Sequence, residues 1–372
     1  MSTGNWIYAR PVWKYSSLMA GAFKGRGALS NPPGRFDKLT HTLEHDGWYE
    51  EEPPNKLETV VLPEPSRSII SRNDSPDIGF DKSINPYRGC AHGCVYCYAR
   101  PSHSYMGLSP GLDFETRLFY KSDAARLLET ELAAPRYQCS TIMLGANTDP
   151  YQPLEKTLCV TRSVLEVLVK CKHPVAITTK GALVARDVDL LAKLASDGLV
   201  RVMFSIPTLD DGLKRILEPR AASATARLRA MRVLADAGVP VGVLVAPIIP
   251  VLTEHEIEAV LGACRGAGAS LAGYTMLRLP WEVKDLFREW LSEHFPDRAA
   301  HVMSQVRDMR GGRENDPSFG TRMHATGPVA QLIRQRFQLA SRRLGFQVNR
   351  GEALPTHLFR PPGGTHEQLD LI

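Results

Sequence analysis

The feature that most constrains the fold is an alternation of short β-branched runs with amphipathic helical stretches between about residues 83 and 295. Such alternation is typical of repeated βα units around a parallel sheet. The pattern predicts strands at residues 83–86, 140–146, 175–179, 199–205, 239–246 and 271–277. It predicts helices at residues 122–134, 161–172, 186–196, 223–237 and 253–267, and a sixth after Pro280.

The ends of these helices are marked in the sequence. Thr253 followed by Glu256 has the spacing of a capping box, and Gly198, Gly238 and Gly268 stand where a left-handed C-cap is expected. A closed barrel of eight βα units takes about 250 residues. Six units therefore predict an α/β fold with a partial (β/α)6 barrel of the TIM type, open at one side. In such folds the loops after the strands form the active site.

The two flanks differ in composition from the barrel region, which we place at residues 81–297. Residues 1–80 are rich in proline, glycine and charge, which predicts an irregular N-terminal extension. Residues 298–372 contain many arginines and no lysine. We expect a small, Arg-rich, helical C-terminal extension with one amphipathic helix near residues 329–344.

Bulk composition indicates a cytoplasmic protein. The longest apolar run, residues 239–252, is broken by three prolines and is shorter than the roughly 20 residues that a membrane helix needs. No secretory signal is evident at the N-terminus. The seven cysteines are odd in number, with three clustered and four scattered, which fits a reducing compartment better than a disulfide framework. The net charge of +5 suits a polyanionic partner without requiring one.

Cys90, Cys94 and Cys97 stand directly after the first predicted strand. Thiolates spaced in this way in one loop can bind three corners of a 4Fe-4S cluster and leave the fourth iron without a protein ligand. The amino and carboxylate groups of S-adenosylmethionine can chelate that iron, and an electron from the reduced cluster can then release a 5′-deoxyadenosyl radical. The alternative is a zinc site with His92 or the nearby His103 as fourth ligand.

The spacing C-x3-C-x-aromatic-C resembles that of the radical S-adenosylmethionine (radical SAM) superfamily. The segments GCAHGCVYCYAR, FSIPT, LEPRAASATARLRAMRVLADAG and GVPVGVLVAPIIP resemble the spore photoproduct lyase-like group, which is related to DNA repair photolyases. The resemblance covers roughly residues 83–279. It implies a lyase-like enzyme with a 4Fe-4S cluster, S-adenosylmethionine and an electron donor such as flavodoxin or ferredoxin.

The resemblance also implies cofactor contacts at three places. Tyr96 would lie against the adenine, the loop with Asn147, Thr148 and Asp149 would bind the methionine amino group, and Lys180 would pair with the methionine carboxylate. The alternatives are a core-packing tyrosine, an ordinary Asx turn and a solvated lysine.

Three further residues close or follow the fourth predicted strand. Ser205 is a candidate for binding the ribose hydroxyls, and Glu218 and Arg220 are candidates for binding ribose or carboxylate. Arg220 could instead be a surface charge.

The chain departs from the lyases at the hydrogen-atom donor. Photoproduct lyases carry a cysteine in the loop after the second strand, where this chain has Asn147. The remaining catalytic candidates are Tyr98, next to the cysteine motif, and Cys139, which precedes the second strand and could instead be a packing residue.

The substrate stays open at this stage. A nucleic acid could bind the C-terminal arginines and the basic stretch at residues 10–38, with stacking on Trp6, Tyr8, Trp13 or Tyr15. The alternatives are a radical enzyme acting on a small molecule and a non-catalytic iron–sulfur or zinc protein that binds nucleic acid.

Overall fold

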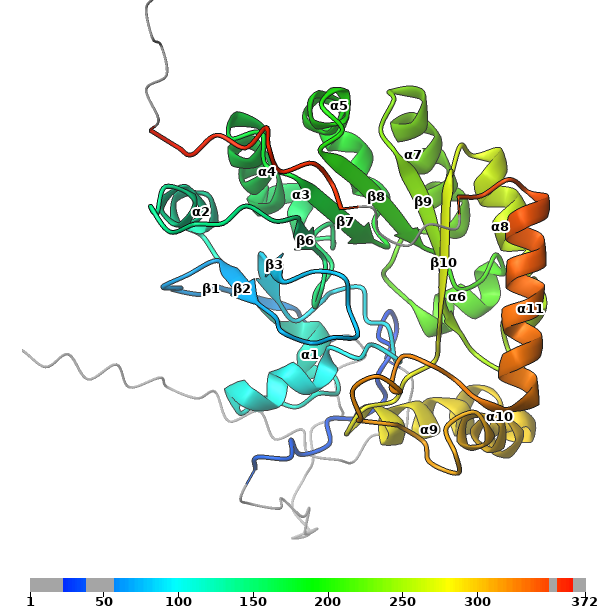
Figure 1. Cartoon of the computed structure of the whole chain (residues 1–372). Helices are drawn as coiled ribbons and strands as arrows, with labels where there is room; N and C mark the ends of the chain where they lie inside the picture. Colours follow the sequence, from blue (N-terminus) through cyan, green and yellow to red (C-terminus); the bar gives the residue numbers. More distant parts are fainter. Residues whose placement is uncertain (1–22, 38–56, 348–352, 364–372) are drawn as a thin grey trace, which may run out of the picture.

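The computed structural model describes residues 23–37, 57–347 and 353–363 (Figure 1). Its main sheet has the order β10-β9-β8-β7-β6-β3-β2, with β10 and β2 at opposite edges. Neighbouring strands are parallel except at the edge pair β2 and β3, which is antiparallel. The strands are β2 (Ile70–Arg72), β3 (Lys82–Ile84), β6 (Ile142–Leu144), β7 (Val175–Thr179), β8 (Val200–Ser205), β9 (Val241–Ile248) and β10 (Leu271–Met276).

The six predicted strands are thus present and parallel, and the predicted partial barrel is confirmed. The helices between them lie on the outside of the sheet (Figure 1). They are α2 (Ala124–Leu132), α4 (Val160–Lys170), α5 (Val188–Ser196), α7 (Ala224–Asp236) and α8 (Ile257–Gly266). The sixth predicted helix, α9 (Val283–His294), follows β10 and packs in a separate buried cluster. Valine, leucine and isoleucine side chains of strands and helices form one continuous buried core between the two layers.

The helix-end predictions were right at the C-termini and wrong at one N-terminus. Gly198, Gly238 and Gly268 have φ of 70°, 78° and 98°, the left-handed region that glycine adopts without strain. The expected capping box does not form. Glu256 instead accepts hydrogen bonds from the Thr208 hydroxyl and the Leu209 amide, at 2.5 and 2.7 Å, and so binds the loop after β8.

The described part of the N-terminal extension is more ordered than its composition predicts. β2 extends the main sheet, and a second small sheet has the order β1-β5-β4, from β1 (Val60–Pro63), β4 (Tyr87–Arg88) and β5 (Arg117–Tyr120). Between β4 and β5 lie η1 (Arg100–Met106) and α1 (Asp113–Thr116). The segment at residues 23–37 runs across this end of the molecule, close to α9 (Figure 1).

The C-terminal region is helical, as expected, but contains α10 (Pro296–Asp308) in addition to the predicted helix, α11 (Gly327–Arg343). α11 packs on α8, and an ion pair of 2.6 Å joins Arg336 Nη2 to Glu258 Oε2. Among the described residues, no helix combines the length and the apolar character that a membrane span requires.

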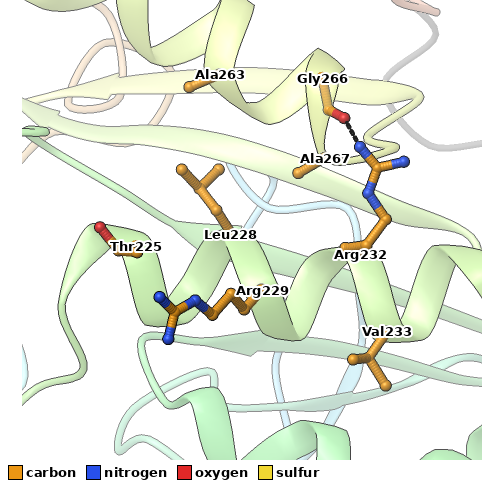
Figure 2. Close-up of a pocket in the computed structure, with 8 residues that line it drawn as sticks. All are labelled: Thr225, Leu228, Arg229, Arg232, Val233, Ala263, Gly266 and Ala267. Atoms are coloured by element: carbon orange, nitrogen blue, oxygen red, sulfur yellow. Dashed lines mark hydrogen bonds between the residues drawn. The ribbon is translucent and has the colours of Figure 1, made fainter.

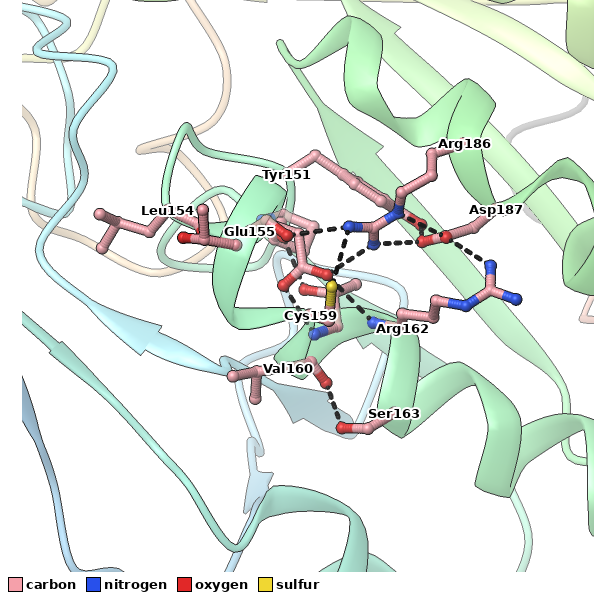
Figure 3. Close-up of polar contacts among 12 residues, drawn as sticks. Tyr151, Leu154, Glu155, Cys159, Val160, Arg162, Ser163, Arg186 and Asp187 are labelled. Carbon is pink, nitrogen blue, oxygen red and sulfur yellow. Dashed lines mark hydrogen bonds and ion pairs between the residues drawn. The ribbon is translucent and has the colours of Figure 1, made fainter.

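A buried ionic cluster fixes the loops that follow β6 and β7 (Figure 3). It involves the short helices α3 (Glu155–Leu158) and η2 (Ala182–Asp187). The Arg186 guanidinium binds Glu155 Oε1 at 2.7 Å and Asp187 Oδ1 at 2.8 Å, and both carboxylates are fully buried. Tyr87 donates to Glu155 and Tyr151 donates to Asp187. These bonds tie two neighbouring loops at the carboxyl ends of the strands into one rigid unit.

Candidate active site

The three cysteines of the motif lie in one loop, which we call the cluster loop (residues 89–97), directly after β4. Cys90 and Cys94 are buried and Cys97 is half-buried. Gly93 has a φ of 68°, and a Cβ there would lie 2.7 Å from Glu115 Oε2. Only glycine therefore lets this loop turn so tightly against its surroundings.

The electrostatics of the loop suit a metal centre. Burial raises the pKa of Cys94, as do the neighbouring charges of Glu218, Cys97 and Cys90, while Lys180 opposes them. Burial and Cys90 likewise raise the pKa of Cys97. A bound metal centre stabilises thiolates and would reverse these shifts. The donor set therefore fits an iron–sulfur cluster, provided that the metal itself supplies the positive charge.

The three cysteines do not form a site for a single metal ion. Among the described residues, no three Cys, His, Asp or Glu side chains meet closely enough to share one metal ion. A cubane does not require this, because each of its irons binds a different thiolate.

A buried ionic network adjoins Cys94 and contains three of the predicted cofactor residues. Tyr96 donates a hydrogen bond to Glu218, which is also paired with the Arg227 guanidinium. The Lys180 ammonium lies 5.7 Å from the centre of the Tyr96 ring. Burial would raise the pKa of Glu218, but Arg227 and Lys180 outweigh it and hold that pKa below its ordinary value. The structure therefore brings the neutral Tyr96 hydroxyl together with the charged Lys180 and Glu218, whose charges compensate each other.

The loop after β6 is held by Asp149. Its carboxylate accepts hydrogen bonds from the Lys180 amide at 2.6 Å and the Thr179 hydroxyl at 2.7 Å. It also lies 3.4 Å from Nδ1 of His92, the residue between the first two cysteines. Burial opposes ionisation of Asp149, but the neighbouring His92 lowers the Asp149 pKa to about 2. Asp149 thus joins the cluster loop to the ends of β6 and β7.

The other two predicted residues of this loop differ in their contacts. Thr148 is buried and its hydroxyl donates to the Tyr87 carbonyl at 2.7 Å. Asn147 is positioned through its backbone amide, which donates to Asn85 Oδ1 at 2.9 Å. Within the part of the chain that the structure describes, no hydrogen bond engages the Asn147 carboxamide.

Two predicted residues of the loop after β8 are engaged by the protein itself. The Ser205 hydroxyl donates to the Ala246 carbonyl at 2.8 Å and is buried. Arg220 is exposed, and its Nη1 lies 3.3 Å from the Thr59 hydroxyl of the N-terminal extension.

The two hydrogen-donor candidates lie at different ends of the barrel. Tyr98 is 53% exposed, and its hydroxyl donates to the Ala146 carbonyl in the loop after β6. Cys139 precedes β6, in electrostatic contact with Lys82 at the amino end of the strands. The structure therefore brings Tyr98, but not Cys139, to the cluster loop. The tryptophans and tyrosines named as stacking candidates, Trp6, Tyr8, Trp13 and Tyr15, lie outside the described residues.

Sequence reasoning missed Arg227, which is 1% exposed and compensates Glu218. A signal was available. Ala224, Arg227, Met231 and Leu234 follow one face of α7 at helical spacing, and all four are buried. An arginine within an otherwise apolar stripe needs a buried anion, because an unpaired charge in the core is very costly.

The pocket in Figure 2 does not belong to this site. It lies between α7 and α8 on the outer, helical surface of the barrel. Thr225, Leu228 and Val233 line it together with two arginines. None of the residues described above contributes to it.

Comparison with known proteins decides the family. The model of the Radical SAM superfamily matches residues 84–264, from β3 to α8, with all three cysteines inside. The chain belongs to the radical SAM superfamily. An uncharacterized protein of Mycobacterium tuberculosis is 35% identical over 264 residues, 70% of this chain and 76% of that protein. An uncharacterized protein of Methanocaldococcus jannaschii is 27% identical over 214 residues, 58% of this chain and 76% of that protein.

Solved radical SAM structures share the fold. Spore photoproduct lyase complexed with dinucleoside spore photoproduct superposes with a TM-score of 0.55 at 16% identity, covering 77% of this chain and 81% of that one. A mutant of that lyase with bound AdoMet and the same dinucleoside gives 0.54 at 17% identity, covering 78% and 81%. Superfamily membership implies cleavage of S-adenosylmethionine through an iron–sulfur cluster, as the cysteine motif predicts.

Proposed function

We propose that this radical SAM protein is a lyase-like enzyme whose 5′-deoxyadenosyl radical abstracts hydrogen from a nucleic acid. One observation carries the proposal. The three-cysteine loop and the ionic network beside Cys94 meet at one end of an open barrel. Cys90, Cys94 and Cys97 would hold the 4Fe-4S cluster. When bound and reduced, the cluster supplies the electron that breaks the sulfonium C–S bond of S-adenosylmethionine.

The chain's own residues bind and orient the cofactor. Burial opposes the charge of Lys180, but Cys94 and Glu218 outweigh it and raise the Lys180 pKa, so its ammonium can pair with the methionine carboxylate. Tyr96 is fixed by its bond to Glu218, and its ring offers a flat surface for the adenine. Asn147 offers the free carboxamide of the loop after β6 to the methionine amino group. His92 and Asp149 hold the two loops at a constant separation.

Three observations support a nucleic-acid substrate. The fold is shared with a lyase solved in complex with a dinucleoside photoproduct. The barrel is open, which leaves a lateral approach for a large substrate. Tyr98 is exposed beside the cluster loop, where a hydrogen-atom relay would have to lie. The electron donor would be a flavodoxin or a ferredoxin.

The experiment is an anaerobic turnover of the reconstituted protein with dithionite and S-adenosylmethionine. We expect release of 5′-deoxyadenosine. We also expect deuterium from a labelled nucleic acid, but not from labelled small-molecule pools, to be transferred into the 5′-deoxyadenosine. Lys180→Ala should weaken cofactor binding in a calorimetric titration, with the exposed Lys193→Ala as matched control. Absence of 5′-deoxyadenosine would refute the radical chemistry, and label arriving only from small molecules would refute the substrate class.

A further inference from the structure

The exposed aromatic side chains of the described residues lie on different segments from the exposed aliphatic ones. Among the described residues, ten large hydrophobic side chains are exposed, and the five aliphatic ones lie on β1, α7 and α11. The five aromatic ones lie on other segments: the stretch at residues 23–37, the chain between β4 and β5, the loop after β10 and the loop between α10 and α11. They are Phe36, Tyr98, Tyr105, Trp281 and Phe319.

Three of these rings surround one arginine, and we call this group the aromatic platform: Arg35, Phe36, Tyr105 and Trp281. The Arg35 guanidinium carbon lies 4.9, 5.2 and 4.6 Å from the centres of the three rings, in that order. Glu282 accepts a hydrogen bond from the Arg35 amide at 3.1 Å and pairs with its guanidinium at 3.5 Å. Because a fixed cation holds the rings together, a ligand would not have to order them first.

Trp281 combines a strained backbone with an exposed side chain. Its φ is 53°, a conformation that a bulky residue rarely adopts, and the side chain is 62% exposed. Burial of the indole therefore does not offset the strain. Strained residues that packing does not explain are concentrated at binding sites.

An arginine with unmet hydrogen-bonding capacity lies on the same loop, directly after β10. Arg278 pairs with no carboxylate among the described residues, and its Nε is buried without an acceptor. Its Nη1 contacts only the Met323 sulfur, at 3.0 Å. The charges of Arg322, Asp77 and Asp316 also act on Arg278, as does Tyr98, and Asp77 is already paired with Arg322 at 2.5 Å. A ligand oxyanion is the group that would satisfy this guanidinium.

We propose that the aromatic platform stacks the unpaired bases of a single-stranded nucleic acid while Arg278 binds its backbone phosphate. Every base offers a π-face, and a single strand exposes that face to side chains that protrude from a surface. The choice of nucleic acid rests on the proposed function. A hydrophobic protein partner fits less well, because none of the five exposed aliphatic side chains lies on the segments that carry the platform.

The test is fluorescence anisotropy of a labelled oligothymidylate with the full-length, reconstituted protein in the absence of S-adenosylmethionine. We expect Trp281→Ala and Tyr105→Ala each to weaken binding about tenfold with an unchanged salt dependence, since stacking is uncharged. Arg278→Gln should lower the slope of log affinity against log salt by about one. Leu339→Ala, an exposed side chain of α11, is the control and should bind like the parent protein.

If Trp281→Ala fails to fold, Trp281→Gly replaces it, because glycine tolerates the positive φ. Platform variants that bind like Leu339→Ala would overturn the proposal. So would an affinity for blunt duplex equal to that for the single strand, or binding of a protein partner but of no oligonucleotide. The binding measurement needs no turnover. The platform proposal can therefore fail while 5′-deoxyadenosine is still released, and oligonucleotide binding can be retained while 5′-deoxyadenosine release fails.

Discussion

The three cysteines of the cluster loop face different charges. Cys94 is opposed by Glu218 and supported by Lys180, whereas Cys97 is supported by Arg100 as well as Lys180. Burial raises the pKa of both thiols, so each releases its proton only when a metal takes its place. Cys139 also has a raised pKa, about 11, because of burial, but it stands alone at the opposite end of β6. The two kinds of cysteine therefore offer a matched comparison.

We predict that Cys94→Ala abolishes cluster assembly and that Cys139→Ala leaves it intact. The first change removes one of three ligands, whereas the second removes a half-buried packing group. Iron and sulfide content and the visible absorption of anaerobically reconstituted protein measure the difference. A brown Cys94→Ala protein with full iron would contradict the ligand assignment.

At the level of helices and strands, the tail at residues 353–363 packs on the amino end of the barrel. Phe359 contacts the rings of Tyr137 and His173, and the Arg360 amide donates to the Cys171 carbonyl at 2.8 Å. His173 is fully buried between the Tyr137 hydroxyl, 2.7 Å from Nε2, and the Pro174 carbonyl, 3.0 Å from Nδ1. The ring uses both nitrogens in its neutral form, with one donating and the other accepting.

Burial lowers the pKa of His173 to about 4, and this predicts a dependence of stability on pH. An unfolded histidine binds a proton near pH 6.5, whereas the folded one stays neutral until about pH 4. The unfolded state therefore binds more protons between these values, and the free energy of unfolding should fall by up to about 3 kcal/mol as pH drops through the window. Burial lowers the pKa of His103 to about 4 as well, so it acts in the same direction.

Urea denaturation between pH 7.5 and 4.5 measures this effect. His173→Asn should have a shallower pH dependence than the parent protein, whatever its stability at neutral pH. An unchanged slope would mean that His173 is already protonated in the folded state.

Much of the element order could be predicted from the sequence, for identifiable reasons. The central strands β7, β8 and β9 are rich in β-branched residues and mostly buried, and glycines such as Gly198 end the helices locally. β5, α10 and the Asp149 bonds were not predictable, because they depend on partners distant in the chain. The Thr253–Glu256 pattern failed for the same reason, since Thr208 and Leu209 provide Glu256 with better partners than its own helix does.

At the scale of the whole molecule, the N-terminal segment is attached to the barrel through one buried carboxylate. Glu115 is fully buried and binds the Gly27 and Ala28 amides at 3.0 and 2.9 Å. It also pairs at 2.5 Å with the buried Arg100 guanidinium, which in turn donates to the Cys94 carbonyl. One side chain thus joins residues 23–37, α1 and the cluster loop.

We predict that Glu115→Ala lowers the free energy of unfolding by about 3–5 kcal/mol, because it leaves the Arg100 charge buried without a counter-ion. Trypsin should also cleave faster after Lys24 and Arg26 in this variant. Urea denaturation and limited proteolysis check both effects. Glu129→Ala, which breaks the exposed pair with Lys170, should change the stability by less than about 1 kcal/mol. Equal effects of the two substitutions would argue against the anchoring role of Glu115.

Gly27 and Gly93 lie in close contact, so the N-terminal segment helps to enclose the cluster loop. A Cβ on Gly27 would lie 1.9 Å from the Gly93 carbonyl oxygen, so the two backbones pass as closely as the atoms allow. Residues that precede the stretch matched by the radical SAM family model thus lie directly against the cluster loop. A protein trimmed to residues 84–264 would keep every sulfur ligand yet leave that loop open to water from behind.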